Sequence, residues 1–120
     1  MTEDQMKQRT REFAVKVIQA VENLPRTTPS MVIGRQIIRS ATSVGANYRS
    51  ACRARSKPDF ISKLAVAEEE SDETQYWLEL LHDLRLIDVD IFRSMHQEAD
   101  ELTRILASSG KTAKGNIVKR

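Results

Sequence analysis

The sequence predicts an all-α fold, a single-domain antiparallel up-down-up-down four-helix bundle. The 120 residues include only three prolines and four glycines, so long segments can remain helical. Apolar residues recur at steps of three and four along four such segments. The connections between the segments are short, which makes neighbouring helices antiparallel. We assign residues 1–110 to the bundle and residues 111–120 to a flexible basic tail.

The first helix is predicted from Asp4 to Leu24. Phe13, Val17 and Val21 follow one another at steps of four and make one apolar stripe. Pro25 and the polar residues after it end the helix, because the residue before a proline disfavours helical geometry.

The second helix is predicted to begin at Ser30, a good N-cap residue. Its apolar stripe consists of Ile33, Ile37, Ala41, Val44 and Tyr48. Small residues are unusually frequent in this helix, and Gly45 lies in its interior. Because an interior glycine costs about 1 kcal/mol relative to alanine, we expect either a tight packing contact at Gly45 or a kink.

The third helix carries the clearest pattern. Ser56 is its predicted N-cap, and Pro58 and Asp59 suit its first turn. Its core stripe alternates steps of four and three, as in bundle packing: Phe60, Leu64, Ala67, Ser71, Thr74, Leu78 and Leu81. A second stripe has apolar ends and two carboxylates in its middle: Val66, Glu70, Glu73, Trp77, Leu80 and Leu84. Two such faces would serve an intramolecular core and a contact between subunits.

The fourth helix is predicted to begin after Asp88 as N-cap and to end at Ser108–Gly110. Its stripe comprises Phe92, Met95, Ala99, Leu102 and Leu106.

Charge is distributed unevenly along the chain. The net charge is only +2, yet residues 30–64 carry +6, residues 65–101 carry −10 and residues 102–120 carry +5. Such asymmetry indicates either attraction between neighbouring helices or chains, or nucleic-acid binding. The basic residues near the second helix are the candidate nucleic-acid contacts: Arg35, Arg39, Arg49, Arg53, Arg55 and Lys57. The alternative is that these side chains are hydrated or paired with carboxylates.

Glu70 and Glu73 would lie near a packed surface and therefore need partners. We predict a polar network between helices or between subunits that consists of Arg39, Asn47, Lys63, Glu70, Glu73 and Trp77. No nucleophile accompanies the two carboxylates, so the sequence favours a structural role and a protein that is not an enzyme.

A metal centre is not predicted either. Glu79 and His82 form one Glu-x-x-His motif, but the second motif of a di-metal bundle is missing, because Arg93 stands three residues before His96. Cys52 is the only cysteine and is expected to be a buried, unreactive thiol. No cofactor, small-molecule substrate or membrane partner is expected. The polar N-terminus and the lack of a spanning stretch predict a cytoplasmic location.

Three segments resemble the four helix bundle protein family, also called the 23S rRNA intervening-sequence protein family. They are Arg-Ser-Ala-Thr-Ser-Val-Gly-Ala-Asn-Tyr at 39–48, Phe-Ile-Ser-Lys-Leu at 60–64 after Ser56, and the segment 70–81 with its Glu-Thr-Gln-Tyr-Trp-Leu core. The resemblance extends from about Arg11 to Leu106. It implies a small antiparallel bundle that in some members assembles as a ring-shaped homopentamer. A related branch, the accessory proteins of diversity-generating retroelements, binds nucleic acid and a reverse transcriptase.

The sequence thus leads to two hypotheses. The first is a homo-oligomeric, pentameric bundle that binds RNA or a nucleoprotein through the basic second helix. The second is a protein-binding or structural oligomer whose arginines pair with Glu70, Glu73 and their neighbours.

Overall fold

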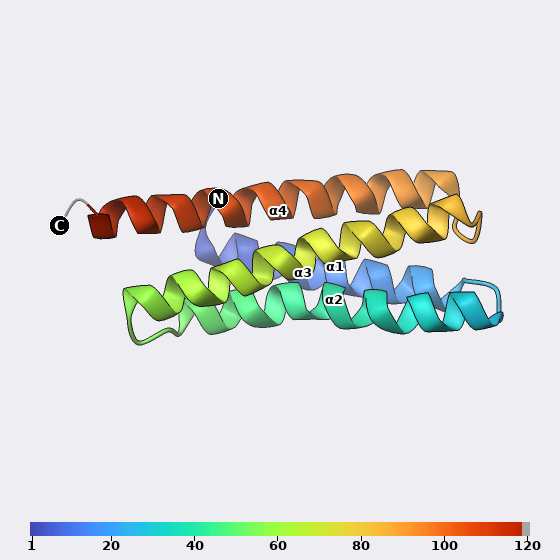
Figure 1. Ribbon diagram of the computed structural model, residues 1–120, viewed down its shortest axis with the longest axis horizontal. Helices are drawn as coiled ribbons and strands as arrows, with labels where there is room; N and C mark the ends of the chain where they lie inside the picture. Colours follow the sequence, from blue (N-terminus) through green and yellow to red (C-terminus); the bar gives the residue numbers. More distant parts are fainter. Residues whose placement is uncertain (119–120) are drawn as a thin grey trace.

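The structure, a computed structural model, describes residues 1–118 and contains four helices in antiparallel order (Figure 1). They are α1 (Glu3–Glu22), α2 (Thr28–Cys52), α3 (Lys57–Asp83) and α4 (Val89–Val118). The all-α four-helix bundle that the sequence predicts is therefore confirmed. α3 packs extensively against both α2 and α4, whereas α1 contacts α2 less and α4 least.

The predicted stripes form the core. In α3 the residues from Leu64 to Leu81 that repeat at steps of three and four are all buried, and Phe60 is half-buried. The other helices contribute buried side chains at the predicted positions, namely Phe13, Val17, Ile33, Ile37, Ala41, Val44, Met95, Ala99, Leu102 and Leu106.

Hydroxyl groups inside this core are paired across helices. Thr74 Oγ1 donates to Ser40 Oγ at 2.8 Å, which joins α3 to α2. Ser71 Oγ donates to the carbonyl of Ala99 at 2.9 Å, which joins α3 to α4. Ser40 and Thr74 can also donate to carbonyls of their own helices, whereas Ser71 donates only to Ala99. Because a buried hydroxyl without an acceptor destabilises the fold, the Ser71 bond favours the observed register of α3 on α4, and the Thr74–Ser40 bond adds a contact that depends on the register of α3 on α2.

The two glycines of α2 mark close contacts with α1. A Cβ atom added at Gly45 would lie 3.1 Å from Thr10 Oγ1, and one added at Gly34 would lie 3.0 Å from a methyl group of Val21. The tight contact expected at Gly45 is therefore present. It holds the backbones of α1 and α2 close together at Thr10.

The helix starts are capped by side chains, and one predicted cap is wrong. Ser56 accepts from the Asp59 N–H and Asp88 from the Ile91 N–H, as predicted. α2, however, begins at Thr28, because Thr27 is its N-cap and accepts from the Ser30 N–H at 3.3 Å. Ser30 is thus the third helical residue, after a proline whose missing N–H costs nothing in the first turn.

The predicted end of the fourth helix is also wrong. α4 continues through Ser108–Gly110 to Val118, so residues 111–118 of the predicted tail are helical, and residues 119–120 lie outside the described part. Ala113 is buried, so the helix still packs on the bundle at this position. None of the four helices, within the described residues, has the long apolar stretch that spanning a membrane requires.

Candidate nucleic-acid interface

The predicted basic residues form an exposed strip on α2. Arg35, Arg39 and Arg49 are exposed on the helix itself, and Arg53 is its C-cap. Fourteen residues are close to four helical turns, so Arg35 and Arg49 lie on the same side. The exposed Arg55 extends the strip into the connection to α3, and Lys57, the first residue of α3, is half-buried.

Arg39 is the one member of this set that has a carboxylate partner among residues 1–115, whose side chains the structure describes. Its Nη1 lies 3.1 Å from Glu70 Oε2, and its Nη2 pairs with Glu73. The Trp77 indole donates to Glu73 Oε2 at 3.0 Å. Four of the six residues predicted for the polar network are therefore joined within one chain, across α2 and α3.

Asn47 and Lys63 do not join this network within the chain. The Asn47 amide donates to the carbonyl of Ser43 at 2.8 Å, inside α2. Lys63 has no ion pair with any side chain that the structure describes. For these two residues, a contact with another subunit stays a prediction.

The outward face of α3 is partly apolar. Val66, Tyr76 and Leu84 are exposed, and Trp77 and Leu80 are half-buried. The rings of Tyr76 and Trp77 are in edge contact, with centroids 5.1 Å apart. This face lies beside the Arg39 network, so a polar anchor and exposed apolar area occur on one surface.

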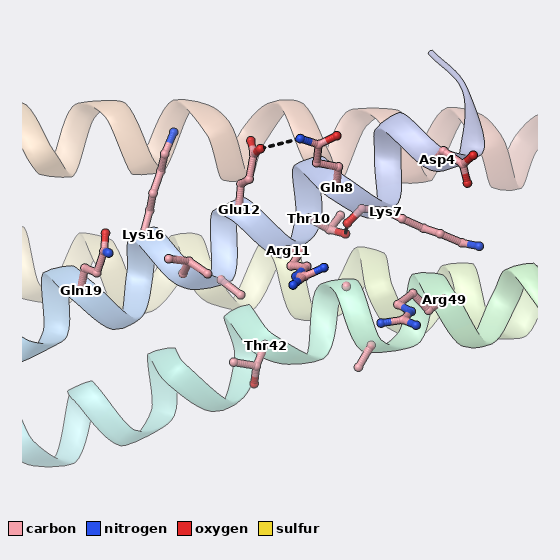
Figure 2. Close-up of a pocket in the computed structure, with 14 residues that line it drawn as sticks. Asp4, Lys7, Gln8, Thr10, Arg11, Glu12, Lys16, Gln19, Thr42 and Arg49 are labelled. Atoms are coloured by element: carbon pink, nitrogen blue, oxygen red, sulfur yellow. Dashed lines mark hydrogen bonds between the residues drawn. The ribbon is translucent and has the colours of Figure 1, made fainter.

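A groove of about 890 Å³ runs between α1 and α2. Thr10 approaches Gly45 between the two helices, and the groove is also lined by the short side chains of Ala14 and Ala46. Figure 2 shows Lys7, Arg11 and Arg49 along the gap between the two helices. In the same view Gln8, Glu12 and Lys16 extend toward the α4 side of α1.

The sequence did not single out Lys7 and Arg11. Residues 1–29 have a net charge of only +1, which hides these two cations among carboxylates. Their spacing of four residues is the signal that could have found them, because it places them on one side of α1. Thr10, which touches α2, indicates that this side faces α2.

Cys52 is the last residue of α2 and is half-buried. Burial raises the pKa of its thiol, and a hydrogen bond with the thiol lowers the pKa of Glu3. Burial also raises the pKa of Tyr48. Cys52 is thus less buried than the sequence predicts, whereas a thiol with a raised pKa is a weak nucleophile at neutral pH.

The histidines near the α3–α4 connection do not converge on a common point. Glu79 Oε2 lies 2.9 Å from His96 Nε2, whereas His82 stacks on Phe92 with ring centroids 4.2 Å apart. Within the described residues there is no group of three His, Cys, Asp or Glu side chains that could hold a metal ion.

The chain matches a family model and solved structures that agree with one another. A family model described as 23S rRNA-intervening sequence protein matches residues 2–108. A solved structure of a protein of unknown function from the S23 ribosomal protein family of Bacteroides thetaiotaomicron is 38% identical and has a TM-score of 0.85. The match covers 92% of this chain and 99% of that one. A comparison with functionally curated proteins finds no match.

Proposed function

The chain belongs to the 23S rRNA-intervening sequence protein family, and from this premise we propose that it is a non-enzymatic, cytoplasmic RNA-binding oligomer. The observation that carries the proposal is the basic strip of α2. Apart from Arg39, the members of the strip have no carboxylate partner among residues 1–115. These members are Arg35, Arg49, Arg53, Arg55 and Lys57. Arginine side chains that are not neutralised within the chain are suited to phosphate contact.

Self-association is the second part of the proposal, with a pentamer as the preferred assembly. The resemblance to ring-forming members of the family supports it, and so does the outward face of α3 with its exposed Tyr76 and Leu84. In a ring every subunit would present the same basic strip. Simultaneous contacts would then increase affinity beyond that of one subunit without any new contact.

The test is a titration of labelled structured RNA with the protein at low and at physiological salt. We expect binding that weakens steeply with salt, because contacts to phosphates release counterions. The triple variant Arg49→Glu/Arg53→Glu/Arg55→Glu should lose affinity by about tenfold or more, since three contacts become repulsive.

The matched control is Arg26→Glu/Arg93→Glu/Arg104→Glu, which changes the net charge equally but leaves the strip intact. Arg26 lies in the α1–α2 connection, and Arg93 and Arg104 lie on α4. Equal losses in the two triple variants would reduce the effect to overall charge and contradict a specific basic strip. Unchanged affinity of the strip variant would contradict it directly.

A protein-binding oligomer without RNA binding is the alternative, and the Arg39 network favours it. In that network one arginine of the strip, Arg39, is already paired with Glu70 and Glu73, beside the outward face of α3. This alternative predicts that Arg39→Ala or Glu73→Ala breaks the assembly. An unchanged mass in light scattering for both variants would eliminate it.

A further inference from the structure

Two arginines from different helices line the α1–α2 groove. Arg11 belongs to α1 and Arg49 to α2, and both are exposed. They flank the point where Thr10 approaches Gly45: Arg11 is the next residue after Thr10, and Arg49 lies about one turn after Gly45. Figure 2 shows both side chains in the gap between the two helices.

Neither guanidinium group has a carboxylate partner among residues 1–115. The carboxylates that line the groove are Asp4 and Glu12, and Glu12 accepts from the Gln8 amide at 3.0 Å on the α4 side of α1. Lys7 has only a long ion pair with Glu3, at 3.7 Å. Cations gathered in one groove repel one another unless an anion binds between them.

The groove suits an extended anion. From Asp4 to Gln19 its α1 side is about 22 Å long at 1.5 Å per residue, which is enough for several successive phosphates. Small side chains that line the groove let a sugar–phosphate chain approach closely. No aromatic residue is among the groove-lining residues, so the groove offers no surface on which a base could stack.

The groove also continues the basic strip of α2. Arg49 belongs to both features. Lys7 lines the same groove as Arg49, and Arg53 follows Arg49 by about one turn, at the end of α2. A nucleic-acid backbone that contacts Arg53 can therefore enter the groove at Lys7 and pass Arg49 and Arg11.

We propose that the α1–α2 groove binds the sugar–phosphate backbone of RNA, with Arg11 and Arg49 contacting phosphates from opposite sides. The inference rests on the proposed RNA binding. It adds the path of the RNA backbone and two residues of α1, Lys7 and Arg11, to the predicted contacts. Recognition is of the backbone and does not depend on base sequence.

The test measures the dependence of RNA affinity on salt for Arg11→Gln and for Arg11→Gln/Arg49→Gln. Each lost phosphate contact should weaken binding severalfold and reduce the log–log salt slope by about 0.7 to 0.9. The controls Arg93→Gln and Arg93→Gln/Arg104→Gln remove the same charges from α4 and should keep the slope. These arginines are exposed, and unchanged melting temperatures would show that the variants fold.

A variant without charge change separates the groove from general electrostatics. Ala46 lines the groove and is exposed, so Ala46→Leu should narrow the groove and still fold. We expect it to weaken RNA binding severalfold.

Three outcomes would overturn the inference, and they are distinguishable. If Arg11→Gln keeps the wild-type slope while Arg53→Gln loses part of it, the strip binds RNA and the groove does not. If Ala46→Leu binds as the wild type does, the groove is not occupied. If the wild-type protein binds no RNA at low salt, the proposed function fails together with this inference.

Discussion

At the scale of single residues, two carboxylates depend on one arginine. Glu70 is largely covered, with a side chain 18% exposed, and Arg39 is its ion-pair partner. Glu73 also accepts from Trp77, so it keeps one hydrogen bond if Arg39 is lost. A guanidinium group can reach both carboxylates because its donors form a planar fork, which a lysine ammonium lacks.

We therefore predict that Arg39→Met lowers the free energy of unfolding by about 1 kcal/mol, because Glu70 then stays partly buried without its partner. Chemical denaturation measures this loss. Arg39→Met/Glu70→Gln should recover part of the stability, since the uncompensated charge is gone. A double variant that is no more stable than Arg39→Met would contradict the dependence of Glu70 on Arg39.

The sequence could predict this network but not its extent. Glu70 and Glu73 share a face of the third helix by spacing alone, so their need for partners was visible. Which cation reaches them depends on the register between α2 and α3, which the buried pair of Ser40 and Thr74 helps to set. The Asn47 amide donates to a carbonyl of its own helix, and residue spacing does not indicate this local hydrogen bond.

At the scale of the helix, α4 shows how packing overrides local stop signals. The Ser108-Ser109-Gly110 segment is typical of a helix end, yet Ser109 Oγ donates back to the carbonyl of Ile105 at 2.9 Å and the helix continues. Ala113 lies seven residues after Leu106 and on the same face, where both are buried. Burial of this face makes continuation favourable despite the glycine. Helix interiors such as the α3 stripe were predictable because periodicity spans many residues, whereas an end depends on one or two.

Gly110 and Gly45 form a matched pair of helical glycines for testing how helix propensity and packing affect stability. Nothing lies within 4 Å of a Cβ atom at Gly110, so Gly110→Ala should raise the free energy of unfolding by about 0.5 to 1 kcal/mol through helix propensity. At Gly45 the added methyl group would press on Thr10, so Gly45→Ala should lack this gain. Thermal and urea unfolding measure both. A loss of stability in Gly110→Ala would indicate that the helix ends at this glycine.

At the scale of the whole molecule, opposite charges lie on different helices of one elongated body. Its extents are 53 × 22 × 20 Å (Figure 1). α2 and the following connection carry the positive strip, and residues 65–101, in α3 and the first part of α4, carry −10. Arg9 links α1 to α4, because it pairs with Glu98 at 2.6 Å and with Glu101, and the hydrogen bond with Glu98 raises the pKa of Arg9. A basic and an acidic side on the same subunit favour head-to-tail contacts, which close into a ring when the rotation permits.

The proposed ring gives the last prediction. Light scattering at physiological salt should give a mass five times the 13.7 kDa of one chain. Tyr76 is 54% exposed on the outward face of α3, so Tyr76→Glu should leave the monomer folded but place a charge in the subunit contact. We expect this variant to dissociate into subunits that still unfold cooperatively. Its RNA affinity should fall with the loss of multivalency.

Ile91→Glu is the control, because Ile91 is similarly exposed, at 41%, but lies at the start of α4. If Tyr76→Glu keeps the wild-type mass while Ile91→Glu lowers it, the subunits meet through α4, and the second face of α3 has another role.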